Sequence, residues 1–327
     1  MKLLNLPFQN PTWLSLALAL LCGLPTYAAN LYPVVVSDRG GYADREGALV
    51  VNPQFERAEA FAENLGAVRM GKRWGFVDDT GKMVVNAQFD AVSPFCEGLA
   101  AVKLGGRFGY IDREGKMVIN PQFDGANRFS EGYAVVKQKR RYGYIDRTGN
   151  LIINPQFDNA GDFSGGLAAV ELGDRYGFIN NTGQFVINPQ FDHAEAFSDG
   201  LAAIKLDRRW GFTKPSGEIV IQPQFDAVGA FSKNLAPARL DGRWGYVDPA
   251  GKFVINPQFD AALPFGKNLA TVKFARRWGY INRDGKYVVN PQFDEAEPFY
   301  EGLARVKLDR KFGYINESGK YVWNPSK

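Results

Sequence analysis

The sequence predicts an all-β fold built from nine antiparallel β-meander repeats in tandem, each 34 residues long. Three observations predict it. A glycine that usually stands between two aromatic residues recurs at one fixed interval, with no insertion or deletion. Asn-Pro pairs and further glycines interrupt any helix inside a unit. Between these breaks the apolar residues alternate with period two, as they do in a half-buried strand.

The motif glycines define nine units. They are Gly41, Gly75, Gly109, Gly143, Gly177, Gly211, Gly245, Gly279 and Gly313. A period of 34 residues is also typical of helical tetratricopeptide repeats, but the recurring Pro, Gly and Asn exclude two helices per unit. With 45% hydrophobic and 14% aromatic residues, the chain can bury a sizeable core.

The first 29 residues have the layout of a signal peptide. Lys2 is their only charge, an apolar run follows over residues 14–24, and the segment ends in Ala28 and Ala29. The apolar run is shorter than the roughly 20 residues that span a bilayer. We therefore predict cleavage near Ala28 or Ala29 and export to the periplasm or the extracellular space.

The mature domain is expected to cover residues 30–327, with the last of its nine units incomplete and no later membrane-spanning segment. The unit around Gly109 illustrates the predicted meander. Strands are expected at 99–104, 108–112 and 117–120, joined by tight turns. The stretch 122–129 permits a fourth, poorer strand, and the pattern leaves open whether it forms.

Two columns of small residues indicate fixed backbone turns. Glycine closes the second turn of every unit at Gly47, Gly81, Gly115, Gly149, Gly183, Gly217, Gly251, Gly285 and Gly319. Only Gly or Asn stands eleven residues before each motif glycine, at Asn30, Asn64, Gly98, Gly132, Gly166, Gly200, Asn234, Asn268 and Gly302. These two residue types tolerate a positive φ most readily, so this second column predicts a left-handed turn.

Aromatic columns supply the expected core. The residue after each motif glycine is Tyr42, Phe76, Tyr110, Tyr144, Phe178, Phe212, Tyr246, Tyr280 or Tyr314, and two further phenylalanine columns run through the repeats. One unit cannot bury them alone. Stacked neighbours would enclose them in a continuous core.

One run carries a family resemblance. It reads Arg243-Trp244-Gly245-Tyr246-Val247-Asp248, then Gly251-Lys252 and Asn256-Pro257-Gln258-Phe259-Asp260. With its recurrence over the whole predicted mature chain, this pattern resembles the bacterial WG-repeat family. The resemblance implies a repeat scaffold and names no activity.

Two arrangements of the nine units fit the pattern: an open solenoid-like stack and a closed β-propeller. The three-strand meander occurs nine times, but the Phe-Asp connector occurs only eight times. Propellers typically have four to eight blades. The counting therefore favours the open stack, with the propeller as the alternative.

The residues offer little for catalysis. His193 is the only histidine, which excludes a His-based triad and a His-rich metal site, and no cofactor is expected. Carboxylates form one column at Asp90, Asp124, Asp158, Asp192, Asp226, Asp260 and Asp294, which keeps a paired-carboxylate glycosidase as a weak alternative. A residue type repeated in this way is more simply explained as a cap of the Phe-Asp turn through its own backbone.

The candidate binding residues form a basic column and the aromatic column that follows it. The basic column is Arg39, Arg73, Arg107, Arg141, Arg175, Arg209, Arg243, Arg277 and Lys311. The candidate set is Arg73, Trp74, Arg107, Arg141, Arg209, Trp210, Arg243, Trp244, Arg277 and Trp278. Either the arginines pair with neighbouring acids and hold the repeats together, or they form a cationic ladder for an acidic glycan or protein.

We therefore predict a binding scaffold for a protein partner, with a cell-envelope glycan module as the alternative and a glycosidase as a weaker one. The near balance of 39 basic and 35 acidic residues does not indicate nucleic acid. Exposure of the tryptophan column distinguishes the first two. Buried tryptophans favour scaffolding, and tryptophans lining an open groove favour sugar stacking.

Overall fold

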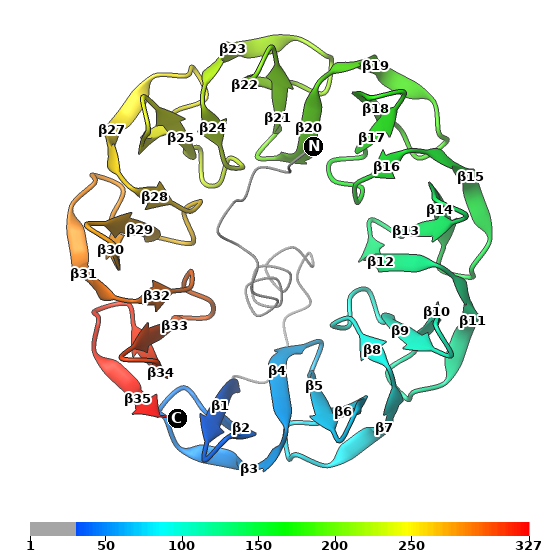
Figure 1. The fold of residues 1–327 in the computed structure, drawn as a ribbon, viewed down its shortest axis with the longest axis vertical. Helices are drawn as coiled ribbons and strands as arrows, with labels where there is room; N and C mark the ends of the chain where they lie inside the picture. Colours follow the sequence, from blue (N-terminus) through cyan, green and yellow to red (C-terminus); the bar gives the residue numbers. More distant parts are fainter. Residues whose placement is uncertain (1–30, 327) are drawn as a thin grey trace.

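The chain forms a closed ring of nine β-sheets, the blades of a β-propeller (Figure 1). The computed structural model describes residues 31–326. The predicted signal peptide lies outside these residues. Within them, no helix is long and apolar enough to cross a membrane.

The open stack predicted from the counting of units is wrong. The first blade, residues 32–55 with three strands, lies beside the last blade, residues 295–326, so the ring closes (Figure 1). The missing ninth connector does not prevent closure, because neighbouring blades meet through side-chain packing and share no strand.

Each complete blade is a four-stranded antiparallel meander in sequence order. The innermost strands are β4 (Arg57–Ala62), β8 (Ala91–Val92), β12 (Gly125–Ser130), β16 (Asn159–Ala160), β20 (His193–Ser198), β24 (Ala227–Val228), β28 (Ala261–Ala262) and β32 (Glu295–Ala296). The second strands are β1 (Tyr32–Val36), β5 (Leu65–Met70), β9 (Ala100–Leu104), β13 (Tyr133–Gln138), β17 (Ala168–Leu172), β21 (Leu201–Leu206), β25 (Ala236–Leu240), β29 (Ala270–Phe274) and β33 (Leu303–Leu308).

The third and outermost strands carry the repeat motif. The third strands are β2 (Arg39–Ala43), β6 (Arg73–Val77), β10 (Arg107–Ile111), β14 (Arg141–Asp146), β18 (Arg175–Ile179), β22 (Arg209–Thr213), β26 (Arg243–Val247), β30 (Arg277–Ile281) and β34 (Lys311–Asn316). The outermost strands are β3 (Leu49–Phe55), β7 (Met83–Phe89), β11 (Met117–Phe123), β15 (Leu151–Phe157), β19 (Phe185–Phe191), β23 (Ile219–Phe225), β27 (Phe253–Phe259), β31 (Tyr287–Phe293) and β35 (Tyr321–Ser326).

The fourth strand, which the sequence left open, forms in eight blades, and its length follows local sequence. It has six residues in β4, β12 and β20, and two residues in the other five blades. In the short cases a proline or glycine follows within two residues, such as Pro94 after β8 or Gly161 after β16. Proline cannot donate to the ladder and glycine weakens a strand interior, so pairing stops there.

The motif glycine lies where the outermost strand bulges against the third strand. In β26 and β27, Trp244 pairs with Phe259 and Tyr246 with Ile255, so the stretch through Asn256 and Pro257 is longer than its partner. A Cβ on Gly245 would lie 2.3 Å from the carbonyl oxygen of Ile255. Only glycine permits this approach, and the bulge accommodates a proline that a regular central strand would exclude.

The hydrophobic core lies between blades. One cluster joins Phe76 and Phe89 of the second blade to Phe95, Val102 and Ile111 of the third. Equivalent clusters fill the other interfaces, including the one between the last blade and the first. A blade therefore buries its aromatic residues only when it has neighbours on both sides.

Buried tyrosines reinforce these interfaces. The hydroxyl of Tyr110 donates to the carbonyl oxygen of Asn127 at 2.7 Å, and that of Tyr246 to Leu263 at 2.8 Å, each in the next blade. The ring of Tyr110 also packs edge-on against Phe129, with centroids 4.9 Å apart. Burial raises the pKa of these hydroxyls, so they remain protonated donors.

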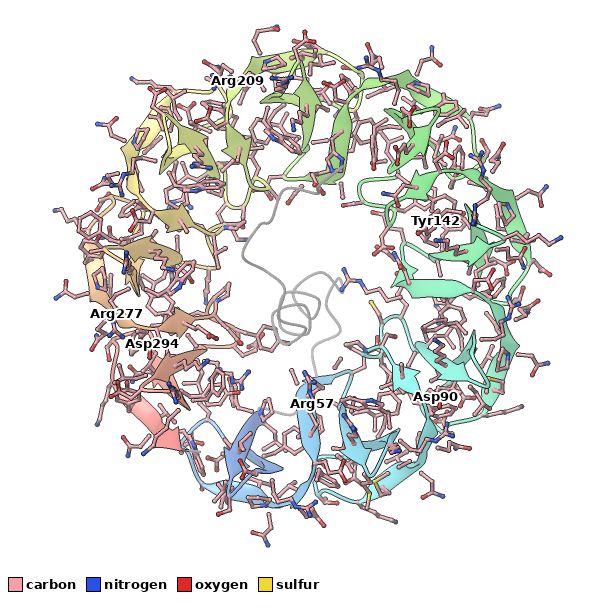
Figure 2. All side chains as sticks on the ribbon, viewed as in Figure 1. Arg57, Asp90, Tyr142, Arg209, Arg277 and Asp294 are labelled. Carbon is pink, nitrogen blue, oxygen red and sulfur yellow. The ribbon has the colours of Figure 1, made fainter. Side chains whose placement is uncertain are left out.

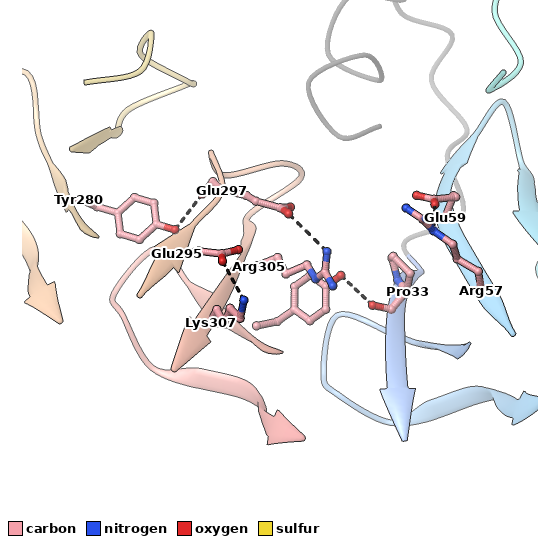
Figure 3. A network of polar contacts seen from close by, with 9 residues as sticks. Pro33, Arg57, Glu59, Tyr280, Glu295, Glu297, Arg305 and Lys307 are labelled. Carbon is pink, nitrogen blue, oxygen red and sulfur yellow. Dashed lines mark hydrogen bonds and ion pairs between the residues drawn. The ribbon is translucent and has the colours of Figure 1, made fainter. Parts of the chain in front are cut away.

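The same contacts close the ring between its two ends (Figure 3). The hydroxyl of Tyr314 in the last blade donates to the carbonyl oxygen of Pro33 on β1 at 2.8 Å. In return, the hydroxyl of Tyr32 donates to the carbonyl oxygen of Glu301 at 3.0 Å. Tyr32, Val34 and Ala43 pack against Leu303 and Tyr314. This last interface is held together by the same types of contact as the others.

The predicted left-handed turn is confirmed at most described positions of the Gly/Asn column. Asn64 has a φ of 68°, Gly98 of 79° and Asn234 of 63°. This turn joins the innermost and second strands of a blade. Its recurring positive φ favours Gly and Asn in the column.

Candidate functional site

The basic column and the aspartate column bind each other. Arg277 on β30 pairs with Asp294, which lies on the connector to the next blade (Figure 2). Six further pairs repeat this contact: Arg73 with Asp90, Arg107 with Asp124, Arg141 with Asp158, Arg175 with Asp192, Arg209 with Asp226, and Arg243 with Asp260. Their side chains are about half exposed, so each pair stabilises the fold by about 1 kcal/mol at most.

The aspartates have a different role from the turn cap that the sequence suggested. One carboxylate oxygen of Asp124 binds Arg107, and the other accepts the backbone N–H of Lys139 at 2.9 Å. Asp158 accepts the N–H of Gly173 at 3.0 Å in the same way. Asp226, Asp260 and Asp294 also accept a turn N–H, so these carboxylates join the connector to the hairpin turns of both neighbouring blades. Their side chains bind neighbouring blades and not their own backbone, so the predicted turn cap is wrong.

The aromatic column lies half-buried under a row of cations. The ammonium group of Lys205 lies 5.7 Å from the ring centroid of Trp210, and that of Lys273 lies 5.6 Å from Trp278. Lys137 covers Tyr142 at 4.9 Å. Trp278 itself is only 7% exposed. Rings covered in this way are poorly placed to stack on a sugar.

The ten candidate residues therefore do not converge on one pocket. Each arginine and its aromatic neighbour occupy the start of a third strand, one set per blade, and the sets are distributed around the ring. The guanidinium groups of these arginines form ion pairs with the aspartate column. The repeated chemistry of these positions is explained by the fold.

One rim of the ring carries more basic than acidic residues. We call it the basic face, and it comprises the hairpin turns between second and third strands together with the connectors between blades. The basic column, the aspartate column and Glu56 all lie on this face. Its further basic residues are Arg69, Lys72, Lys103, Lys137, Lys139, Arg140, Lys205, Arg208, Arg239, Lys273, Arg276, Lys307 and Arg310. Its further acidic residues are Asp38, Glu171, Asp174, Asp207, Asp241, Glu295 and Asp309. This face therefore carries more positively than negatively charged side chains.

The opposite rim, which we call the acidic face, has the reverse balance. It holds the turns on either side of the Gly/Asn column and those closed by the Gly47 column. Its acidic residues are Asp44, Glu46, Glu63, Asp78, Asp79, Glu97, Asp112, Glu114, Glu131, Asp146, Asp199, Glu218, Asp248, Asp284, Glu301 and Glu317. Its basic residues are Arg45, Lys82, Arg113, Lys116, Arg147, Lys214, Lys233, Lys252, Lys267, Arg283, Lys286 and Lys320. The disc is therefore electrically polarised.

A group of arginines at the tips of the basic face was not among the residues predicted from the sequence. Arg140, Arg208, Arg276 and Arg310 occupy the second position of their hairpin turns. They directly precede the basic column in four of its blades, and this doublet was the signal that could have revealed them. All four side chains are exposed.

A second missed feature is a charged cluster beside the closing interface (Figure 3). Glu297 is buried, and its Oε1 lies 3.4 Å from the guanidinium of Arg305, while its Oε2 has no hydrogen-bond partner among the described residues. Burial raises the pKa of Glu297 to about 7, against the attraction of Arg305. Glu59, across the first blade, adds to this rise and itself pairs with Arg57 at 2.6 Å.

His193 lies on β20 and pairs with Glu195 at 3.0 Å, next to the rings of Tyr176 and Trp210. Among residues 31–326, Glu195 is the only hydrogen-bond partner of the His193 ring. Across residues 31–326, no group of three His, Cys, Asp or Glu side chains is arranged to hold a metal ion.

Among the solved structures that resemble the ring, two serve to compare the fold. A crystal structure of the eukaryotic initiation factor matches with a TM-score of 0.64 and 10% identity, over 90% of this chain and 95% of that one. The dihydro-heme d1 dehydrogenase NirN matches with a TM-score of 0.50 and 14% identity, over 93% and 75% respectively. At such identities the likeness concerns the fold alone.

No curated protein is significantly similar in sequence. The family model of the WG containing repeat, in contrast, matches eight successive segments of the chain. They are residues 41–74, 74–108, 108–140, 142–176, 176–210, 210–244, 244–274 and 278–312. These matches span most of the ring and follow its blades, and the chain belongs to the WG containing repeat family.

Proposed function

We propose that this propeller is an exported scaffold that binds a protein partner and performs no catalysis. The observation that carries the proposal is the composition of the basic face. Exposed apolar side chains, among them Met70, Leu104, Leu172 and Phe274, stand directly before its hairpin turns. Apolar side chains interspersed with arginine are typical of protein interfaces.

The alternatives have weaker support. A glycan-binding module would need aromatic rings open for stacking, and the rings at Trp210 and Trp278 are covered by lysines. A glycosidase would need a pair of free carboxylates, and the aspartate column is engaged with arginines and turn amides. A scaffold that binds a protein therefore has more support than a glycan module or a glycosidase.

Capture followed by reconstitution tests this function. The mature protein should retain a protein from a cell-envelope extract after cross-linking, and that partner, once identified and purified, should rebind it saturably. Retention of envelope polysaccharide without any protein would instead support the glycan module. A variant with both Leu104 and Leu172 replaced by Ser should bind the purified partner more weakly, because the apolar contacts are lost.

Export is part of the proposal. The mature chain should begin near Asn30, since the predicted cleavage site precedes it. Intact-mass measurement of the protein from its own cell provides the test. A mass that includes residues 1–28 would contradict export by cleavage.

A further inference from the structure

Four arginines stand at backbone positions that suit glycine better. Arg140, Arg208, Arg276 and Arg310 have φ values of 77°, 70°, 68° and 66°. The equivalent residues of two other blades are Gly106 and Gly242, with φ values of 83° and 80°. A side chain in the left-handed region is strained, and these turns form without one. The arginines therefore lower the stability of their turns.

Within residues 31–326, the arginine side chains make no contact that compensates this strain, although backbone N–H groups of three of these turns bind the aspartate column. Among the described residues, the four guanidinium groups make no ion pair or hydrogen bond to another side chain. The neighbouring Arg141, Arg209 and Arg277, in contrast, bind the aspartate column. The fold thus explains the second residue of each of these three doublets and leaves the first unexplained.

The placement of these arginines matches a partner that spans several blades. Arg140, Arg208 and Arg276 are separated by two repeats each, so they mark alternate blades of one face. Their exposed side chains extend from the turns, where they can pair with carboxylates of a partner. A row of basic groups that repeats with the blades suits an extended acidic surface.

We propose that these four arginines are docking points for an acidic protein surface. The inference rests on the proposed function, since it names the partner's chemistry and the face that binds it. Two of the tips carry an acid beside the arginine, at Asp207 and Asp309, which disfavours a uniformly anionic membrane or nucleic acid. The apolar Phe274 precedes the turn of Arg276, and Leu104 precedes a turn of the same face without such an arginine; both would contact apolar groups between the acids.

The test removes the arginines while preserving the turns. A variant carrying Arg140→Gly, Arg208→Gly, Arg276→Gly and Arg310→Gly should bind a labelled peptide of repeating Glu-Glu-Leu about tenfold more weakly than the wild type, measured by fluorescence anisotropy. Its denaturation midpoint should equal or exceed that of the wild type, because glycine relieves the strain. Lost binding then does not reflect unfolding.

The matched control removes the same charge from the acidic face. Lys82, Lys116, Lys252 and Lys286 are replaced by Gln, the residue that Gln184 already supplies at the equivalent position. Peptide affinity should stay within about twofold, as expected for charges remote from the interface. Equal weakening by both variants would mean that only net charge matters and would overturn the docking assignment.

Two further outcomes would overturn it. The first is wild-type binding to phosphatidylglycerol vesicles without binding to the peptide, which would assign the face to a membrane. The second is equal affinity of the wild type and the arginine variant for the purified partner obtained by capture. That result would leave the scaffold function intact and show that the partner docks elsewhere.

Discussion

Replacing Gly245 by alanine is expected to prevent folding or to lower the free energy of unfolding by about 4 kcal/mol or more. The added Cβ would lie 2.3 Å from the carbonyl oxygen of Ile255 and 2.8 Å from the backbone of Asn256 and Pro257. These atoms belong to the backbone bulge of the outermost strand, and no side-chain rotation can relieve the overlap. Urea denaturation followed by tryptophan fluorescence measures the loss.

Gly105→Ala is the control for this prediction. The position has a φ of 58°, a methyl group added there would have no neighbouring atom within 4 Å, and Ala275 occupies the equivalent turn position with a φ of 46°. The substitution should change the free energy of unfolding by at most about 1 kcal/mol. If both variants lost the same free energy of unfolding, Gly245 would be needed for its backbone conformation and not for the close approach of the two strands.

Replacing Glu297 by glutamine is expected to stabilise the ring at alkaline pH. The pKa of Glu297 rises from 4.5 to about 7 because the carboxyl is buried, so the folded state holds a proton that the unfolded state has released between these values. This contribution is fully present below pH 4.5 and is lost as the pH rises through about 7. The shift corresponds to about 3 kcal/mol.

The charged surroundings set the size of this effect. Arg305 lowers the pKa of Glu297, and Glu295 and Glu59 raise it. We expect Glu297→Gln to increase the free energy of unfolding by about 2 kcal/mol at about pH 8 and to leave it nearly unchanged at about pH 4, because glutamine resembles the protonated acid. Urea denaturation at the two pH values measures both.

Glu295→Gln separates this effect from a general change of charge. Glu295 is partly exposed and pairs with Lys307 at 2.8 Å, so its replacement should give no gain at alkaline pH. An equal gain in both variants would assign the effect to acidic repulsion across the cluster. An unchanged pH profile in Glu297→Gln would show that the buried carboxyl does not titrate near neutrality.

Much of the repeat was predictable, because it depends on local backbone chemistry. The short strands, their turns and the left-handed conformations at Asn64 and Gly98 follow from alternation and from the residues that accept a positive φ. The fourth strand could not be decided locally, since its length depends on where a residue such as Pro94 interrupts pairing with the neighbouring strand.

The candidate site was predictable only in part. The basic column was visible in the sequence, and so was the possibility that it pairs with acids. Its partner lies seventeen residues away, as Arg277 does from Asp294, and only the connector's path brings the two together. The arginines at the turn tips became notable once their φ values showed a strain without an internal partner.

By itself, the sequence determined the all-β class, the 34-residue unit, its glycine turns and its membership of the repeat family. Only the tertiary structure decided that the nine units close into a ring. Closure depends on the angle between neighbouring blades, which is set by the packing of residues such as Tyr110 against Phe129 and accumulates over all the interfaces. A residue pattern specifies each interface but not that accumulated angle, so the contact of Tyr314 with Pro33 could not be read from it.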